Sequence, residues 1–169
     1  DLAELALHRV QRVAVLDRPR HEQLIADIRA AGAGTRLIMD GDVAGGVNAA
    51  RWDSAIDMCV GIGGTPEGII TACAVKALGG VIQGRLWPKD DEERQRAIDA
   101  GHDLSRVLQA NDLVASDNAY FVATGITDAE FIDGVQRRGP FVRAESIVMR
   151  SHSGTIRHVI SDMDPNRWN

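Results

Sequence analysis

The sequence contains little of what defines secreted, membrane-bound or thiol-ligated metal proteins. Only two of its 169 residues are cysteines, Cys59 and Cys73, and they form no CxxC pair. A disulfide-stabilised scaffold is therefore disfavoured, and a reducing cytoplasm is the expected compartment. The longest apolar run, residues 68–75, is far shorter than the roughly 20 residues that span a bilayer. No positively charged segment followed by an apolar run opens the chain, so no signal peptide is expected.

Positive charge is also scarce. The chain has 19 Lys and Arg against 24 Asp and Glu, a formal net charge of −5. Nucleic acids and anionic membranes require a basic face, so neither is expected as a partner. With 44% hydrophobic residues, the length suits a single domain over residues 1–169 that buries a core without disulfides or structural metals.

Short apolar runs alternate with helical patterns in the first half of the chain. The runs are rich in Val, Ile and Leu and do not alternate with polar residues, which is typical of strands buried on both faces; they are residues 13–16, 37–39 and 56–62. A helix is predicted over residues 21–31 and ends at Gly32. A second is predicted over residues 66–78, with Thr65 as its N-cap and Gly79 at its end.

The second half of the chain adds further strands and one charged helix. The predicted strands are 81–86, 119–124, 145–150 and 155–160, the predicted helix is 90–100, and residues 162–169 are expected to fray. The last two strands flank a turn at 151–154 and predict a closing hairpin. The whole pattern predicts an α/β fold, with a mostly parallel or mixed sheet flanked by helices and a C-terminal antiparallel hairpin.

Polar segments follow three of the predicted strands. Residues 17–21 follow the first, residues 40–42 the second, and the glycine-rich residues 61–68 the third. In open parallel sheets, ligands bind beyond the carboxyl ends of the strands. We therefore expect these three segments to lie at one edge of the sheet.

Each segment has a structural and a functional interpretation. Arg18 and Arg20 are either solvated charges or anion ligands, because guanidinium groups match phosphate oxygens with paired hydrogen bonds. Asp40 and Asp42 either cap the next helix, ligate a metal or accept hydrogen bonds from sugar hydroxyls. Glu67 is favoured in the first turn of a helix by the macrodipole alone, although a glycine-rich turn at a helix N-terminus also suits phosphate.

Better-known motifs do not fit the glycine-rich segment. A Rossmann fingerprint beginning at Gly61 would need glycine where the chain has Pro66, and no Gly-Lys-Ser/Thr tripeptide of a P-loop occurs. The five histidines lack zinc-ligand spacing. Cys59 and Cys73 are interpreted as packing residues, because no base is placed beside either.

Several segments, taken together, resemble the class II fructose-1,6-bisphosphatases of bacteria, which belong to the lithium-sensitive superfamily of sugar and inositol phosphatases. The similarity runs in one register from about residue 13 to residue 157. The segments that carry it are Leu-Asp-Arg-Pro-Arg-His at 16–21, Asp-Gly-Asp-Val at 40–43, Gly-Ile-Gly-Gly-Thr-Pro-Glu-Gly at 61–68, and residues 78–80, 123–128 and 146–150.

The resemblance implies a metal-dependent phosphatase. Members of this family hydrolyse the 1-phosphate of fructose 1,6-bisphosphate in gluconeogenesis with Mn²⁺ or Mg²⁺, and some photosynthetic members also accept sedoheptulose 1,7-bisphosphate. It further implies that a basic pair contacts a substrate phosphate, two carboxylates hold the sugar and one glycine contacts substrate through its backbone: Arg18, Arg20, Asp40, Asp42 and Gly64. Glu67 matches a metal ligand of the family.

The family's main metal-binding segment, of the Asp-Pro-x-Asp-Gly-Thr type, has no copy in this sequence. We therefore expect the chain to be the C-terminal half of such an enzyme, whose partners are fructose 1,6-bisphosphate, the N-terminal half and further copies in a homo-oligomer. Mn²⁺ and Mg²⁺ take about six oxygen ligands, so Glu67 alone cannot hold one and the half is expected to be inactive by itself. The alternative is a non-catalytic module that binds sugar phosphates without metal.

Overall fold

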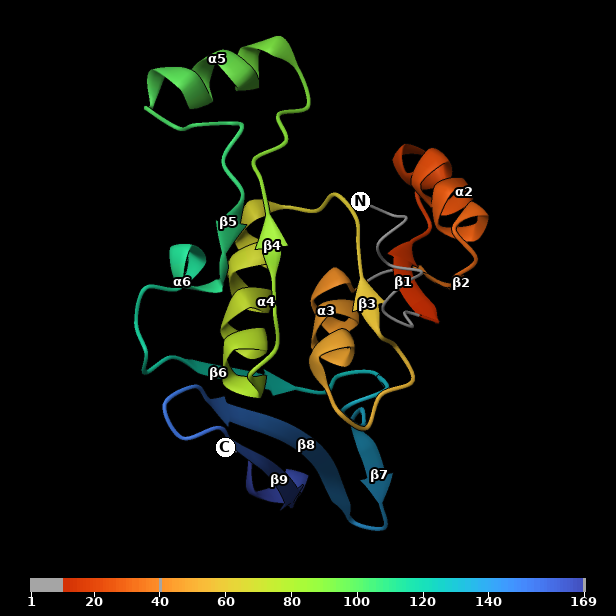
Figure 1. Ribbon diagram of the computed structural model, residues 1–169. Helices are drawn as coiled ribbons and strands as arrows, with labels where there is room; N and C mark the ends of the chain where they lie inside the picture. The colour runs from red at the N-terminus through yellow and green to blue at the C-terminus, as the bar shows by residue number, and fades with distance from the viewer. Residues whose placement is uncertain (1–10, 40, 169) are drawn as a thin grey trace.

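The computed structural model describes residues 11–39 and 41–168 (Figure 1). The strands are β1 (Arg12–Leu16), β2 (Gly34–Ile38), β3 (Met58–Cys59), β4 (Gln83–Gly84), β5 (Leu108–Gln109), β6 (Tyr120–Thr124), β7 (Gln136–Arg138), β8 (Phe141–Arg150) and β9 (Thr155–Met163). The helices are α2 (Glu22–Ala30), α3 (Asp42–Ala50), α4 (Thr65–Leu78), α5 (Asp91–Asp99) and α6 (Ala110–Leu113), with 3₁₀ turns η1 (Pro19–His21) and η2 (Pro165–Arg167). Helix α3 packs on the β1–β3 side and against α4, and α4 packs on β6 and β8.

A parallel sheet in the order β2-β1-β3 forms the first half. Val13 and Val15 of its central strand are fully buried and pack with Ile25 and Ile28 of α2. Because β2 and β3 lie on opposite sides of β1, the chain changes direction across the sheet at β1. The crevice beyond the carboxyl ends of β1 and β3 is therefore a topological switch point, where open α/β sheets bind ligands.

Two adjacent glycines allow α3 to fit between the parallel sheet and α4. A Cβ added to Gly45 would lie 2.9 Å from Cδ1 of Ile38 and 3.0 Å from Sγ of Cys59, and one added to Gly46 would overlap the Thr71 side chain of α4. No helix range was predicted here, although Asp40 and Asp42 were considered as caps of a following helix, because Gly-Gly is a weak helix former. Close approach on both faces explains why glycine occupies these positions.

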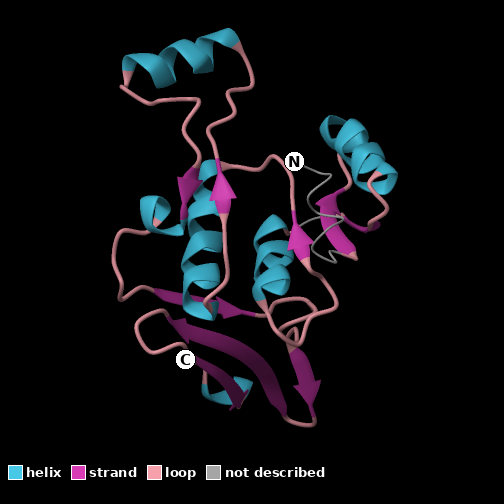
Figure 2. Cartoon of the chain, in the orientation of Figure 1, coloured by secondary structure: helices cyan, strands magenta, loops and turns pink. Residues whose placement is uncertain are grey.

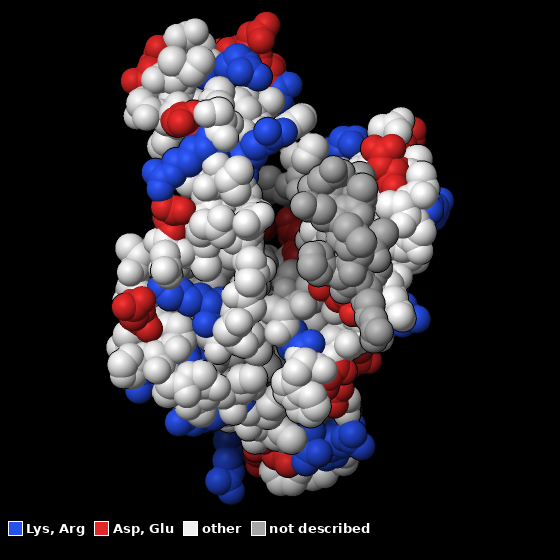
Figure 3. Space-filling view, viewed as in Figure 1, with Lys and Arg blue, Asp and Glu red and all other residues white. Residues whose placement is uncertain are grey.

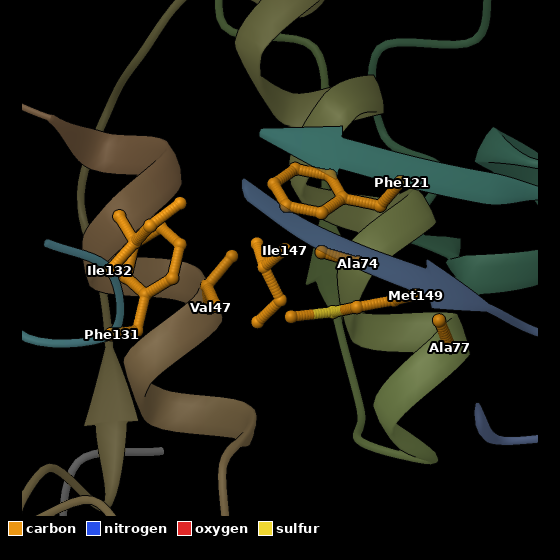
Figure 4. Close-up of a cluster of buried hydrophobic side chains, with 8 residues drawn as sticks. All are labelled: Val47, Ala74, Ala77, Phe121, Phe131, Ile132, Ile147 and Met149. Atoms are coloured by element: carbon orange, nitrogen blue, oxygen red, sulfur yellow. The ribbon is translucent and has the colours of Figure 1, made fainter. Parts of the chain in front are cut away.

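An antiparallel sheet forms the second half, with β8 between β6 and β7 and with β9 also paired to β8. Its buried face joins α3 and α4 in one apolar cluster, seen in Figure 4: Val47, Ala74, Ala77, Phe121, Phe131, Ile132, Ile147 and Met149. This cluster fixes α4, and with it the residues at the start of that helix.

The predicted α/β class is confirmed, with parallel and antiparallel strands in separate sheets (Figure 2). The strand predicted over 56–62 has only two paired residues, because the glycines after Cys59 leave the sheet. The strand predicted over 81–86 is likewise reduced to β4. The turn of the closing hairpin lies where it was predicted, but β8 begins four residues earlier and β9 ends three residues later than predicted. Part of the tail that was expected to fray is therefore ordered, as the end of β9 and as η2.

Helix α5 projects from the body on the β4–β5 ribbon, as the green segment of Figure 1 shows. Asp90 caps it, accepting a 2.8 Å hydrogen bond from the Glu93 amide. None of its residues is buried, and acidic and basic side chains both cover it (Figure 3). Within residues 11–39 and 41–168, no helix combines the length and apolarity needed to cross a bilayer.

We expect Ile147→Ala to destabilise the chain by about 2–5 kcal/mol, because the side chain is 1% exposed in the main cluster and its loss leaves a cavity. The matched control is Ile160→Ala on β9, whose side chain is 60% exposed, with an expected loss below about 1 kcal/mol. Urea unfolding measures both. Equal losses would contradict the assignment of the core.

Candidate functional site

The loop after β1 turns sharply at Pro19, which opens η1. The turn carries His21 back beneath the strand end, where the side chain is completely buried. Its Nδ1 lies 2.9 Å from the carbonyl oxygen of Leu16, the last residue of β1. The imidazole of His21 therefore connects the loop back to the end of β1, the strand that precedes the loop.

The same loop holds the glycine-rich segment after β3 through the backbone of Ile62. The Ile62 N–H donates to Nε2 of His21 at 2.8 Å. The Ile62 carbonyl accepts from Nε and Nη2 of Arg20 at 3.1 and 2.8 Å. The backbone N–H and carbonyl of Ile62 are thus hydrogen-bonded to two consecutive side chains of the β1 loop, His21 and Arg20.

Because the glycines of this segment have no side chain, side chains from all three polar segments can lie against its backbone. An added Cβ would lie 3.1 Å from Cε1 of His21 at Gly61 and 2.5 Å from Oδ2 of Asp42 at Gly63. At Gly64 it would overlap the carboxylate of Glu67. The segments that follow β1, β2 and β3 therefore meet around this backbone, as the strand-end argument predicted.

Asp42 is the first residue of α3, and Gly41, with a φ of 84°, precedes it as the N-cap. Its Oδ1 accepts from the Val43 amide at 3.1 Å. Burial raises the pKa of the Cys59 thiol to about 11, and the negative charge of Asp42 contributes to the rise. Asp42 therefore lies close to the end of β3. Asp40, its predicted partner, falls outside the described residues.

Helix α4 begins one residue earlier than predicted. Gly64, rather than Thr65, is the N-cap, and no side chain caps this terminus. Thr65 is instead the first helical residue and Pro66 the second, a position where the missing N–H of proline breaks no intrahelical hydrogen bond. Glu67 lies exposed in the first turn, where the macrodipole favours its charge.

The predicted phosphate-binding arginines have different surroundings. Arg20 is exposed, and two of its nitrogens donate to Ile62. Arg18 is partly buried and in extended backbone conformation, and its Nη1 donates to the neighbouring carbonyl of Asp17 at 3.2 Å. The guanidinium of Arg18 therefore makes fewer hydrogen bonds to other segments than that of Arg20, and more of its donors remain for a ligand.

The described residues do not by themselves fit a divalent cation. Among them no group of three or more His, Cys, Asp or Glu side chains could hold a metal ion. Glu67 is at most one ligand, so further oxygen ligands would have to come from elsewhere.

No role in this site was predicted for His21. The residue ends the first polar segment and the motif at 16–21 that carries the family resemblance, but neither pattern assigned it a function. A histidine directly after a buried strand, in a loop already carrying two arginines, was the available signal.

These features define a class: an α/β protein with a candidate anion site at the switch point of a parallel sheet, between an arginine-bearing loop and a glycine-rich helix start. More specifically, the chain belongs to the family of bacterial fructose-1,6-bisphosphatases, glpX-encoded, whose model matches residues 3–163. The resemblance found in the loop segments is thereby confirmed.

Two relatives illustrate the match. The class 2 fructose-1,6-bisphosphatase of Haemophilus influenzae is 40% identical over 162 residues, covering 88% of this chain and 49% of that protein. Fructose-1,6-bisphosphatase 1 class 2 of Escherichia coli K12 is 36% identical, covering 88% and 48%. The chain spans about half the length of these relatives. A solved sugar N-methyltransferase from Streptoalloteichus, with 13% identity, 96% and 69% coverage and a TM-score of 0.26, is too dissimilar to inform the fold.

The proximity of Asp42 and Cys59 can be tested through thiol reactivity. In a Cys73→Ser background, Asp42→Asn should lower the Cys59 pKa, so more thiolate forms at a given pH and alkylation by iodoacetamide accelerates. Because burial is the larger cause of the raised pKa, the increase should stay below about tenfold, the equivalent of one pKa unit. Asp27→Asn on α2 is the control and should leave the rate unchanged. An unchanged rate in Asp42→Asn would contradict the convergence of the segments.

Proposed function

We propose that this chain supplies the substrate-binding half of a metal-dependent fructose-1,6-bisphosphatase of class 2, which releases the 1-phosphate of the sugar. The observation that carries the proposal is the convergence of the segments after β1, β2 and β3 at the switch point. The roles given to their residues below are those that the resemblance of these segments to the family implies. A reducing cytoplasm and a homo-oligomeric assembly are part of the same proposal.

Arg18 and Arg20 would bind a substrate phosphate away from the reacting bond. Guanidinium groups form charge-assisted, paired hydrogen bonds to phosphate oxygens. Because Arg20 already donates to Ile62 through Nε and Nη2, Arg18 would carry the larger share of the direct contact. Arg20 would add positive charge while holding the loop in place.

Asp40, Asp42 and Gly64 would recognise the sugar. Asp42 uses Oδ1 for the start of α3, while Oδ2 lies against Gly63. A carboxylate oxygen held there is suited to accept hydrogen bonds from neighbouring sugar hydroxyls. The uncapped start of α4 at Gly64 places backbone amides beside the same position.

Glu67 would be one ligand of a Mn²⁺ or Mg²⁺ ion whose remaining ligands lie in a segment equivalent to the other half of the relatives. Such an ion, when bound, polarises phosphoryl oxygens and favours attack by water. The surface beside Glu67 supports a covering segment, since Ile69 and Ile70 of α4 are 41% and 48% exposed. Adjacent apolar side chains at a helix start are otherwise costly to leave in water.

The direct test compares phosphate release by the chain alone and by the chain joined to the other half of a class 2 relative, with saturating Mn²⁺. We expect no release from the chain alone and release from the joined protein. Rapid phosphate release by the chain alone would overturn the proposal that the other half must supply the remaining metal ligands. If the joined protein binds bisphosphate without metal and releases nothing, the chain is a non-catalytic sugar-phosphate-binding module.

In the joined protein, Glu67→Gln should reduce kcat by orders of magnitude, because it removes the charge that a hard cation requires. Gly64→Ala should act in the same direction, since its Cβ displaces the Glu67 carboxylate. The matched control is Gly68→Ala, where a Cβ meets nothing within 4 Å and the helix gains about 0.5–1 kcal/mol. Activity at several Mn²⁺ concentrations, with melting curves, measures all three.

If Glu67 serves only the helix dipole, Glu67→Gln would instead lose roughly 0.3–1 kcal/mol of stability and keep its activity. That result would remove Glu67 from the metal site.

A further inference from the structure

The glycine-rich segment has few side chains of its own with which to fix its position. Gly61, Gly63 and Gly64 carry none, and Ile62 between them is the residue whose backbone is bonded to the β1 loop. Glycine has more backbone freedom than any other residue, so ordering this segment is entropically expensive. The apolar cluster holds the body of α4. The bonds to Ile62 are therefore the main constraint on the glycine-rich segment that leads from the end of β3 to that helix.

The geometry of His21 sets its tautomer. Because the Ile62 amide donates to Nε2, that nitrogen carries no proton. The proton of an uncharged imidazole then lies on Nδ1, which donates to the Leu16 carbonyl. The ring therefore donates to the end of β1 through Nδ1 and accepts from the loop after β3 through Nε2. Among the amino acids, only histidine carries such a donor and such an acceptor on opposite sides of one rigid ring.

We propose that His21 is a positioning residue, whose Nδ1–H tautomer keeps the phosphate-binding loop and the glycine-rich, metal-binding loop in fixed register. The proposal rests on the proposed function, because it assigns the two loops their roles. Arg18 and Arg20 lie on one side of this bridge and Gly64 and Glu67 on the other. Because the ring is completely buried, its proposed role is to hold the two loops and not to contact the substrate.

Two substitutions separate the bridge from simple packing. His21→Asn keeps a donor near Nδ1 for Leu16 but has no atom at Nε2, so the bond to Ile62 is lost. His21→Gln places a carbonyl oxygen near Nε2 that can accept from Ile62. Both are polar and smaller than histidine, but Asn is one methylene shorter than Gln and loses more packing at this buried position. Melting temperatures of the two variants are therefore compared alongside the other measurements. The surface control is His102→Asn, which is exposed.

The first measurement uses the chain itself and does not depend on activity. Long-range ¹H–¹⁵N spectra of the His21 ring should show a protonated Nδ1 and an unprotonated Nε2. Amide signals of Gly63, Gly64 and Glu67 should shift in His21→Asn and stay near their original positions in His21→Gln. A protonated Nε2, or equal shifts in the two variants, would overturn the proposal even if the chain releases no phosphate in any assembly.

The second measurement is steady-state kinetics of the joined protein. His21→Asn should lower kcat by about 10- to 100-fold, because misplacing catalytic groups by about 1 Å has effects of this size. KM for the bisphosphate should change less than about threefold, since the arginine loop is retained, and His21→Gln should recover most of the kcat. Equal losses in both variants, tracking equal falls in melting temperature, would reduce His21 to a packing residue. Absence of activity in the unmodified joined protein would overturn the proposed function, and the spectra would then decide on His21.

Discussion

The backbone of Ile62, bonded at its N–H by His21 and at its carbonyl by Arg20, is the interaction on which the site depends. These hydrogen bonds join the loops after β1 and β3; Arg20 and Ile62 are 42 residues apart in the sequence. Glycines leave the segment free to approach other groups closely, and the same freedom makes it costly to order. A buried imidazole and a guanidinium supply the order that the segment's own side chains cannot.

The rest of the fold brings these loops together. The order β2-β1-β3 places the ends of β1 and β3 next to each other. Gly45 and Gly46 let α3 lie close to Cys59 and Thr71, which brings Asp42 to the glycine-rich loop. The antiparallel sheet contributes no residue to the site, but its face holds α4 and thereby the position of Glu67.

Local patterns predicted the parts of the structure that local chemistry determines. The apolar run of β1, the helix ends at Gly32 and Gly79, and the charged helix α5 all follow from a few neighbouring residues. The capping role of Asp90 was not predicted, because the predicted helix included that residue. The range of helix α3 was not predicted, although a capping role for Asp40 or Asp42 implied a helix after them, because its glycines are explained only by distant contacts. The convergence of the segments was predictable from the strand-end rule, whereas the role of His21 was not, since its partner Ile62 lies far along the chain.

Hydrogen exchange at the Ile62 amide tests this account most directly. Because the N–H donates to a completely buried ring, we expect it to exchange as slowly as amides within β1, although it lies in a loop. The amides of Gly63 and Gly64 donate no hydrogen bond within residues 11–39 and 41–168, so they serve as internal references and should exchange much faster. Exchange of Ile62 at the rate of these two glycines would contradict the claim that His21 holds the loop.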